Sequence, residues 1–317
     1  MALVNYIRVS GLSPAGTLIL IALAGGLASP LHVHAQQMDH AHHQAEGDVP
    51  VMPSASMIMP MIRNPMLPGL KRARPSVTDF LPGDGIDPAS LPMAGPRRIE
   101  DLASGDTLDL EATLVRKMVA GQTFVMYAFN QQIPGPLIRV ERGAEIHVRF
   151  TNRIDMETTV HWHGLRLDNQ FDGVPGLTQD PVQPGETFDY TIRFPDAGIF
   201  WYHPHVREDI QQDLGLYGNM LVHPDREPYE DPVHREEVVT LDDILIEGKD
   251  LVPFGREAAN FSIMGRFGNV LLVNGETRYD LDAKAGEVIR FHLTHVSNTR
   301  TFNLSFGGAP MKLVGAD

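Results

Sequence analysis

Two pairs of histidines in this sequence have a spacing that suits metal binding. The chain has only two tryptophans; one separates His161 from His163, and the other lies two residues before the pair formed by His203 and His205. Side chains at positions i and i+2 of a β-strand project from the same face, so each pair can present both imidazoles together if its segment is a strand. Two such strands side by side would bring four imidazoles to one patch. Because imidazole favours copper, zinc, iron or nickel over magnesium or calcium, we expect a transition-metal site.

The bulk composition limits what such a site can contain. Among its 317 residues the chain has no cysteine, which excludes disulfides, thiolate metal ligands and a cysteine nucleophile. A metal must therefore be held by histidine, carboxylate, methionine or backbone atoms. The formal net charge of −14 disfavours nucleic acid and anionic membrane surfaces, so we expect no nucleic-acid partner.

Alternating hydrophobic residues from about residue 105 onward predict β-strands. In the stretch AEIHVRFTN, Ile146, Val148 and Phe150 fall on one face and polar residues fall on the other. Similar short runs recur between turn signals such as QPGET and DAGIF, and long helical stretches are missing from the pattern. This arrangement is typical of an all-β protein built as an antiparallel sandwich or barrel.

A weak internal repeat indicates that the β-rich part contains two related units. The stretch RGAEIHVRFTN at 142–152 resembles AGEVIRFHLTHVSN at 285–298, since each has a glycine, an acidic residue, an alternating strand and then an asparagine. We therefore expect two copies of one β-domain, at residues 105–226 and 233–317, joined by a proline-containing linker.

The N-terminal part reads as an export signal followed by an irregular arm. The apolar stretch 17–28 is too short to span a bilayer and precedes a VHA cleavage pattern, so we expect residues 1–35 to be a signal peptide. An uncleaved membrane anchor is the alternative. After cleavage the chain would have no membrane span and would function in the periplasm or outside the cell. Residues 36–104 are rich in methionine, histidine and proline; we expect an irregular arm whose thioethers and imidazoles suit copper. A flexible leader whose methionines pack on the following domain is the alternative.

Several motifs together resemble a known family, the multicopper oxidases. The stretch HWHG, followed about 40 residues later by FWYHPH, is similar to the first two copper-binding motifs of this family. The resemblance covers residues 105–317 and includes PGPLIRVERGAEIHVRFTN and GLYGNMLVHP. The methionine-rich arm further resembles that of periplasmic copper-resistance oxidases and bacterial laccases.

The resemblance implies a fold, a cofactor and a role for each site residue. It implies tandem cupredoxin-like Greek-key β-sandwiches and a trinuclear copper cluster that reduces O₂ to water with electrons from a phenol-like or metal-ion substrate. His161 would bind the type 2 copper, and the type 3 pair would be bound by His163, His203 and His205. Asp172 matches a family acid that relays protons near the cluster; a turn aspartate before a glycine is the alternative.

The sequence also departs from the family pattern. A type 1 copper site needs a cysteine thiolate, and neither a cysteine nor the two C-terminal copper motifs are present. We therefore expect the N-terminal part of a longer oxidase, with an incomplete second cupredoxin domain, half of the cluster histidines and no activity on its own. A copper carrier without redox turnover and a mononuclear zinc or iron enzyme are alternatives. Copper nitrite reductases are disfavoured because they need a cysteine near the second histidine pair.

Overall fold

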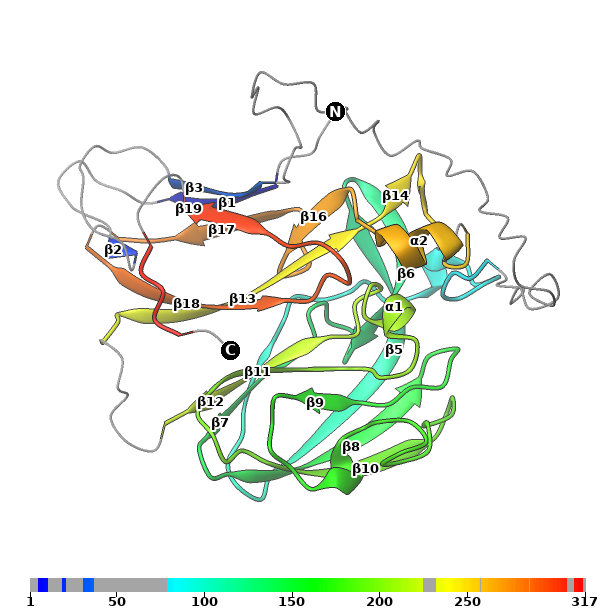
Figure 1. Ribbon diagram of the computed structural model, residues 1–317, viewed down its shortest axis with the longest axis horizontal. Helices are drawn as coiled ribbons and strands as arrows, with labels where there is room; N and C mark the ends of the chain where they lie inside the picture. Colours follow the sequence, from blue (N-terminus) through cyan, green and yellow to red (C-terminus); the bar gives the residue numbers. More distant parts are fainter. Residues whose placement is uncertain are drawn as a thin grey trace, which may run out of the picture.

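The computed structural model is almost entirely β-structure (Figure 1). It describes residues 5–10, 19–20, 31–36, 79–224, 232–256, 258–284, 286–306 and 311–315. The methionine- and histidine-rich stretch 37–78 lies outside the described residues, and so does most of the apolar stretch 17–28. Within the described ranges, no helix combines the length and the apolar character needed to cross a membrane.

Two sheets form the first unit of the molecule. One has the strand order β10-β8-β5-β6, with β5 Thr107–Val119, β6 Gln122–Phe129, β8 Glu145–Arg153 and β10 Thr187–Arg193. The other has the order β4-β7-β12-β11-β9, with β4 Ile99–Asp101, β7 Leu137–Glu141, β9 His161–His163, β11 Gly198–His203 and β12 Gly218–His223. The rest of the described arm is irregular apart from the short helix η2, Pro88–Ser90.

The core of this unit lies between the inward faces of its strands. Ile146, Val148 and Phe150 on β8 are each at most 1% exposed, whereas His147 and Arg149 between them are exposed. This alternation is the one expected from the sequence, because successive side chains of a strand point to opposite faces. Large aromatic side chains fill the interior, among them Tyr127, Trp162, Tyr190 and Tyr202.

The second unit contains two four-stranded sheets and a small hairpin. The first sheet has the order β16-β13-β18-β2, with β2 Ile19–Leu20, β13 Arg235–Ile244, β16 Val270–Val273 and β18 Val288–His295. The second has the order β17-β1-β3-β19, with β1 Asn5–Ser10, β3 Leu31–Gln36, β17 Arg278–Asp282 and β19 Asn303–Phe306. The hairpin pairs β14 Ile246–Glu247 with β15 Asp250–Leu251. The helix α2, Ala258–Met264, also belongs to this unit, whereas η3, Asn169–Phe171, and α1, Glu208–Gln211, belong to the first.

Short strands from the expected signal segment lie in the second unit. β1 pairs with β17, β3 pairs with β19, and β2 pairs with β18. β1 and β3 lie side by side in the middle of the second sheet, and β2 forms one edge of the first. The sequence pattern did not suggest this role.

The two segments that resemble each other in sequence occupy equivalent places in the two units. β5 pairs antiparallel with β6, the next strand of the chain, and parallel with β8. In the same way β13 pairs antiparallel with β16 and parallel with β18. Since 142–152 contains most of β8 and 285–298 contains β18, the internal repeat coincides with a repeated strand arrangement.

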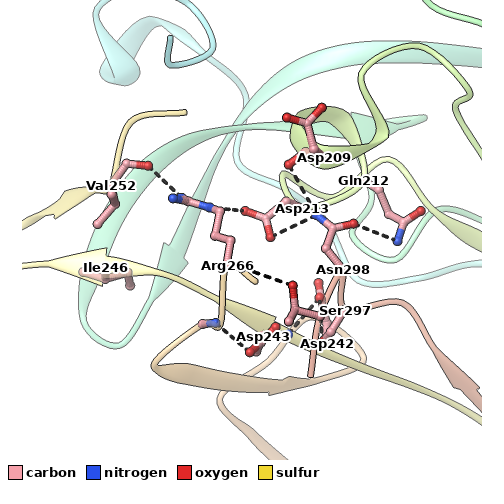
Figure 2. A network of polar contacts seen from close by, with 12 residues as sticks. Asp209, Gln212, Asp213, Asp242, Asp243, Ile246, Val252, Arg266, Ser297 and Asn298 are labelled. Carbon is pink, nitrogen blue, oxygen red and sulfur yellow. Dashed lines mark hydrogen bonds and ion pairs between the residues drawn. The ribbon is translucent and has the colours of Figure 1, made fainter. Parts of the chain in front are cut away.

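A buried polar network joins the two units around α1 (Figure 2). Arg266 donates to the carbonyl of Val252 at 2.7 Å, and its Nε lies 3.5 Å from the carboxylate of Asp213, which is two residues beyond the end of α1. Gln212 donates to the carbonyl of Val296 at 2.6 Å. Burial raises the pKa of Asp213 to about 7. The helix that follows the second histidine pair is thus anchored on the second unit.

Candidate metal centre

Three of the four histidines lie on neighbouring strands, as the sequence predicted. β9 and β11 pair antiparallel, and His161 stands directly opposite His203 in their register. Trp162 and Tyr202, also opposite each other, point to the other face and are completely buried in the core. Because side chains alternate along a strand, burial of these two aromatic rings turns the histidines toward one common face.

The four imidazole rings gather within a small volume. One nitrogen from each of His161, His163 and His203 can be chosen so that all three lie within 4.8 Å of one another. The shortest separation is 3.2 Å, from His163 Nδ1 to His203 Nε2. The ring of His205 completes the group, with its centroid 4.4 Å from that of His161 and 5.3 Å from that of His203. This spacing suits shared metal ions.

His205 reaches the group from a loop and not from a strand. The sequence suggested a strand for both members of the second pair, but β11 ends at His203. Pro204 has no N–H to donate to a neighbouring strand, which explains why the strand stops there. The backbone N–H of His205 instead donates to Thr159 Oγ1 at 3.3 Å, and its Nδ1 lies 3.5 Å from the carboxylate of Glu208 on α1.

Backbone carbonyls determine which ring nitrogen of two histidines is left free for a metal. His161 Nδ1 lies 2.7 Å from the carbonyl oxygen of Asp172, and His203 Nδ1 lies 2.9 Å from that of Pro204. A carbonyl oxygen can only accept a hydrogen bond, so each Nδ1 must carry the proton in the neutral ring. The Nε2 atoms of both rings therefore keep their lone pairs available.

The surroundings keep these rings in the form that binds metals. Burial lowers the pKa of His203 to about 3, with a smaller contribution from the neighbouring imidazoles. Burial likewise lowers the pKa of His163 and of His205. The three rings are neutral at pH 7, and neutral imidazole is the state that donates a lone pair to a metal ion.

Trp201 packs directly on the histidines. Its ring is stacked on His203, with centroids 4.0 Å apart and planes inclined by 21°, and its centroid is 4.9 Å from that of His163. The sequence drew attention to this tryptophan by its position but gave no role for it. In the structure it restricts the rotation of two rings and covers one side of the site.

This histidine-bearing segment matches a known family. Residues 113–227 match the family model described as multicopper oxidase. Over these residues the chain is similar to the multicopper oxidases. The prediction from the HWHG and FWYHPH motifs is therefore confirmed at the level of the family.

Named multicopper oxidases and copper-resistance proteins resemble the chain in sequence and structure. It is 35% identical over 171 residues to a copper resistance protein A homolog of Pseudomonas syringae pv. tomato, covering 53% of this chain and 28% of that protein. It is 33% identical over 154 residues to copper resistance protein A of Escherichia coli, covering 49% and 24%. The chain thus matches about a quarter of the length of these curated relatives.

Solved multicopper oxidase structures have the same fold. The multicopper oxidase of Pseudomonas thermotolerans superposes with a TM-score of 0.54 at 37% identity, covering 64% of this chain and 48% of that one. Lac15 from a marine microbial metagenome gives a TM-score of 0.50 at 34% identity, covering 61% and 48%. The predicted all-β, cupredoxin-like fold is confirmed by these similarities and by the observed sheets.

The donor atoms of the site are compatible with copper, the metal of this family. A metal–imidazole bond is about 2.0 Å long, so two nitrogens 3.2 Å apart can bind one ion at an angle of about 106°. Imidazole nitrogens bind copper well, and this angle is close to the tetrahedral value. His147, by contrast, lies exposed on β8 beside Thr191 and outside the group.

Asp172 lies beside the histidine group through both its backbone and its side chain. It follows η3 directly, and its carboxylate Oδ1 is 3.3 Å from His161 Nδ1. The side chain is 34% exposed, so it can exchange protons with solvent. The sequence singled out the carboxylate; it contained no signal for the backbone carbonyl, for Thr159 or for Glu208, because these contacts depend on the folded loops.

Proposed function

We propose that this chain supplies half of the histidines of a trinuclear copper cluster in a laccase-like multicopper oxidase. Such a protein would couple one-electron oxidation of a phenol-like or metal-ion substrate to the four-electron reduction of O₂ to water. The observation that carries the proposal is the convergence of four imidazoles from β9, β11 and the loop after it, with ligand nitrogens as close as 3.2 Å. When bound, several coppers supply the four electrons that O₂ requires.

Within this proposal the four histidines would divide three coppers among them. His161 would hold the type 2 copper through Nε2, since its Nδ1 is engaged with a carbonyl. His163 and His203 would share one type 3 copper, which their 3.2 Å nitrogen separation supports. His205, which is oriented by Thr159 and Glu208, would hold the other type 3 copper. Neutral imidazoles hold both Cu(I) and Cu(II), so the ligands can stay in place during turnover.

We further propose that Asp172 moves protons at this site. Reduction of O₂ to water consumes protons, and a partly exposed carboxylate 3.3 Å from His161 can take them from solvent and pass them inward. Asp172→Asn should leave the copper content unchanged and slow oxygen reduction in the complete oxidase. Unchanged turnover in this variant would exclude the relay role.

The residues of this chain offer no electron entry site of the type 1 kind. A type 1 copper needs a cysteine thiolate, and the chain has none. We propose that residues 105–226 and 233–317 are two cupredoxin-like units, that the chain is inactive alone, and that residues 1–35 direct export to the periplasm or cell exterior. We also propose that the methionine- and histidine-rich arm within 36–104 collects copper, a role that its deletion would test by changing copper loading.

Metal titration of the 317-residue chain tests the copper proposal. We expect copper to bind at the histidine group. We expect His203→Ala to weaken that binding strongly, because His163 and the stacked ring of Trp201 both lose their partner. His147→Ala is the matched control, since it removes an exposed histidine from a neighbouring sheet. Binding should be followed by metal analysis and by the electron paramagnetic resonance signal of Cu(II).

Three results would count against the oxidase. Equal copper affinity in the two variants would exclude the histidine group as the site. One zinc ion per chain, with no copper preference, would favour the mononuclear enzyme. Copper bound tightly in a longer gene product that fails to consume O₂ with any reducing substrate would favour the carrier.

A further inference from the structure

We infer that Gly173 is a positioning residue for the copper site: it lets the backbone carbonyl of Asp172 reach His161 and so leaves Nε2 of that ring free. The inference rests on the proposed copper-binding function, and it assigns the orientation of His161 to backbone atoms. It also separates two properties of Asp172, whose carboxylate serves proton transfer and whose carbonyl holds the ring.

Distances favour the carbonyl over the carboxylate as the partner of His161. Nδ1 lies 2.7 Å from the carbonyl oxygen, a normal hydrogen-bond length, and 3.3 Å from carboxylate Oδ1. Every amino acid at position 172 would provide the same carbonyl. The orientation of the ring therefore depends on where the backbone of residue 172 lies, and not on the acidic side chain.

The position of that backbone depends on the absence of a side chain at residue 173. Gly173 has φ of +76°, a conformation that other residues rarely adopt. A Cβ atom built on it would lie 2.1 Å from the carbonyl oxygen of Val160 and 2.9 Å from the backbone nitrogen of His161. Both contacts are far inside van der Waals distance, and both atoms belong to the main chain, which cannot rotate away as a side chain can.

The opposing backbone is itself fixed. Val160 is completely buried, and its N–H donates to the hydroxyl of Tyr190 at 3.1 Å. On the far side of the glycine, the N–H of Val174 donates to Thr178 Oγ1 at 2.8 Å, which closes the loop on itself. The backbone at Val160, directly before β9, is therefore held in place. An added Cβ at residue 173 must displace the loop instead, and the carbonyl of Asp172 moves with it.

The same loop offers a matched control. Gly176 also has a positive φ, +70°, but a Cβ built on it meets no atom within 4 Å. Alanine costs backbone strain at both positions, whereas only Gly173→Ala also pushes the loop away from His161. A comparison of the two variants therefore isolates the contact from the strain.

Nuclear magnetic resonance of the metal-free 317-residue chain, labelled with ¹⁵N in its histidines, reads the proton position directly. We expect His161 to carry its proton on Nδ1 in the wild type, in Gly176→Ala and in Asp172→Ala, which keeps the carbonyl and loses the carboxylate. We expect Gly173→Ala to lose this preference. In a parallel titration with Cu(II), Gly173→Ala should bind about 10- to 100-fold more weakly than Gly176→Ala, as is usual when the partner of a ligating histidine is lost.

Two outcomes would overturn the inference. One is loss of the Nδ1 proton in Asp172→Ala, which would make the carboxylate the orienting group; this variant decides the matter even if Gly173→Ala does not fold. The other is Gly173→Ala behaving like Gly176→Ala. Failure of the proposed copper-binding function gives a distinguishable result. In that case the wild-type chain binds no copper, while His161 of the metal-free chain still carries its proton on Nδ1.

Discussion

The buried carboxyl of Asp213 should make the stability of this protein fall as the pH rises from about 4 to about 7. Asp213 lies in the network that joins the two units. Among the described residues, the cation that contacts it is Arg266, with Nε 3.5 Å from its carboxylate (Figure 2). Burial raises its pKa from 3.8 to about 7, and the nearby carboxylate of Asp243 adds to the shift. Burial also raises the pKa of Asp242 well above its usual range.

The sign and size of the effect follow from this difference in pKa. Between pH 4 and pH 7, approximately, the folded chain keeps a proton on Asp213 that the unfolded chain has released, so raising the pH favours the unfolded chain. A pKa difference of about 3 corresponds to about 4 kcal/mol of unfolding free energy across this window. Asp213→Asn stays neutral in both states, so it should remove this part of the pH dependence.

Urea unfolding followed by circular dichroism, at several pH values from about 4 to about 8, measures the effect. The free-energy difference between wild type and Asp213→Asn should fall by up to about 4 kcal/mol as the pH rises through the window. Asp209→Asn is the control, because Asp209 lies nearby but its side chain is 61% exposed and pairs with Arg207. Parallel pH profiles for wild type and Asp213→Asn would refute the reasoning.

Two further substitutions test the packing beneath and beside the histidines. Gly218→Ala places a Cβ atom 2.2 Å from the ring of Tyr202, which is completely buried next to His203, so overpacking should destabilise the fold by about 1–3 kcal/mol in thermal unfolding. Trp201→Ala removes the ring stacked on His203 and should weaken copper binding in titrations, with loss of order in the His203 and His163 resonances.

Each of these predictions has a conservative counterpart. Gly95→Ala adds a Cβ atom whose nearest neighbour is 3.8 Å away and should leave the melting temperature nearly unchanged; equal destabilisation by both glycine variants would contradict the overpacking argument. Trp201→Phe keeps an aromatic ring over His203 and should retain most of the copper affinity. If Trp201→Ala binds copper as tightly as Trp201→Phe, the stacking has no part in holding the site.

The strands and the histidine pairs were predictable because they depend on local rules. The alternation of Ile146, Val148 and Phe150 directly indicated which face of β8 is buried, and the structure has all three inside. The spacing of His161 and His163 likewise predicted that both imidazoles face one way. These inferences hold because the period of a β-strand is a property of the backbone itself, independent of what packs against it.

Other features of the site were not visible in the sequence. The alternation rule wrongly extended a strand through Pro204, although His205 still joins the group from the loop. The carbonyl of Asp172 and the glycine that follows it gave no sign of their contacts with His161 and Val160. An aspartate–glycine pair indicates a turn, but it does not say which backbone the turn will touch.

The sequence by itself thus determined the type of strand, the buried faces and the kind of metal ligand, since these depend on side-chain chemistry and on spacing of a few residues. Only the tertiary structure decided that His161 stands opposite His203, which ring nitrogens stay free, and how the acidic residues around Asp213 are buried. Those features come from strand register, loop placement and desolvation, which arise when segments far apart in the chain pack together.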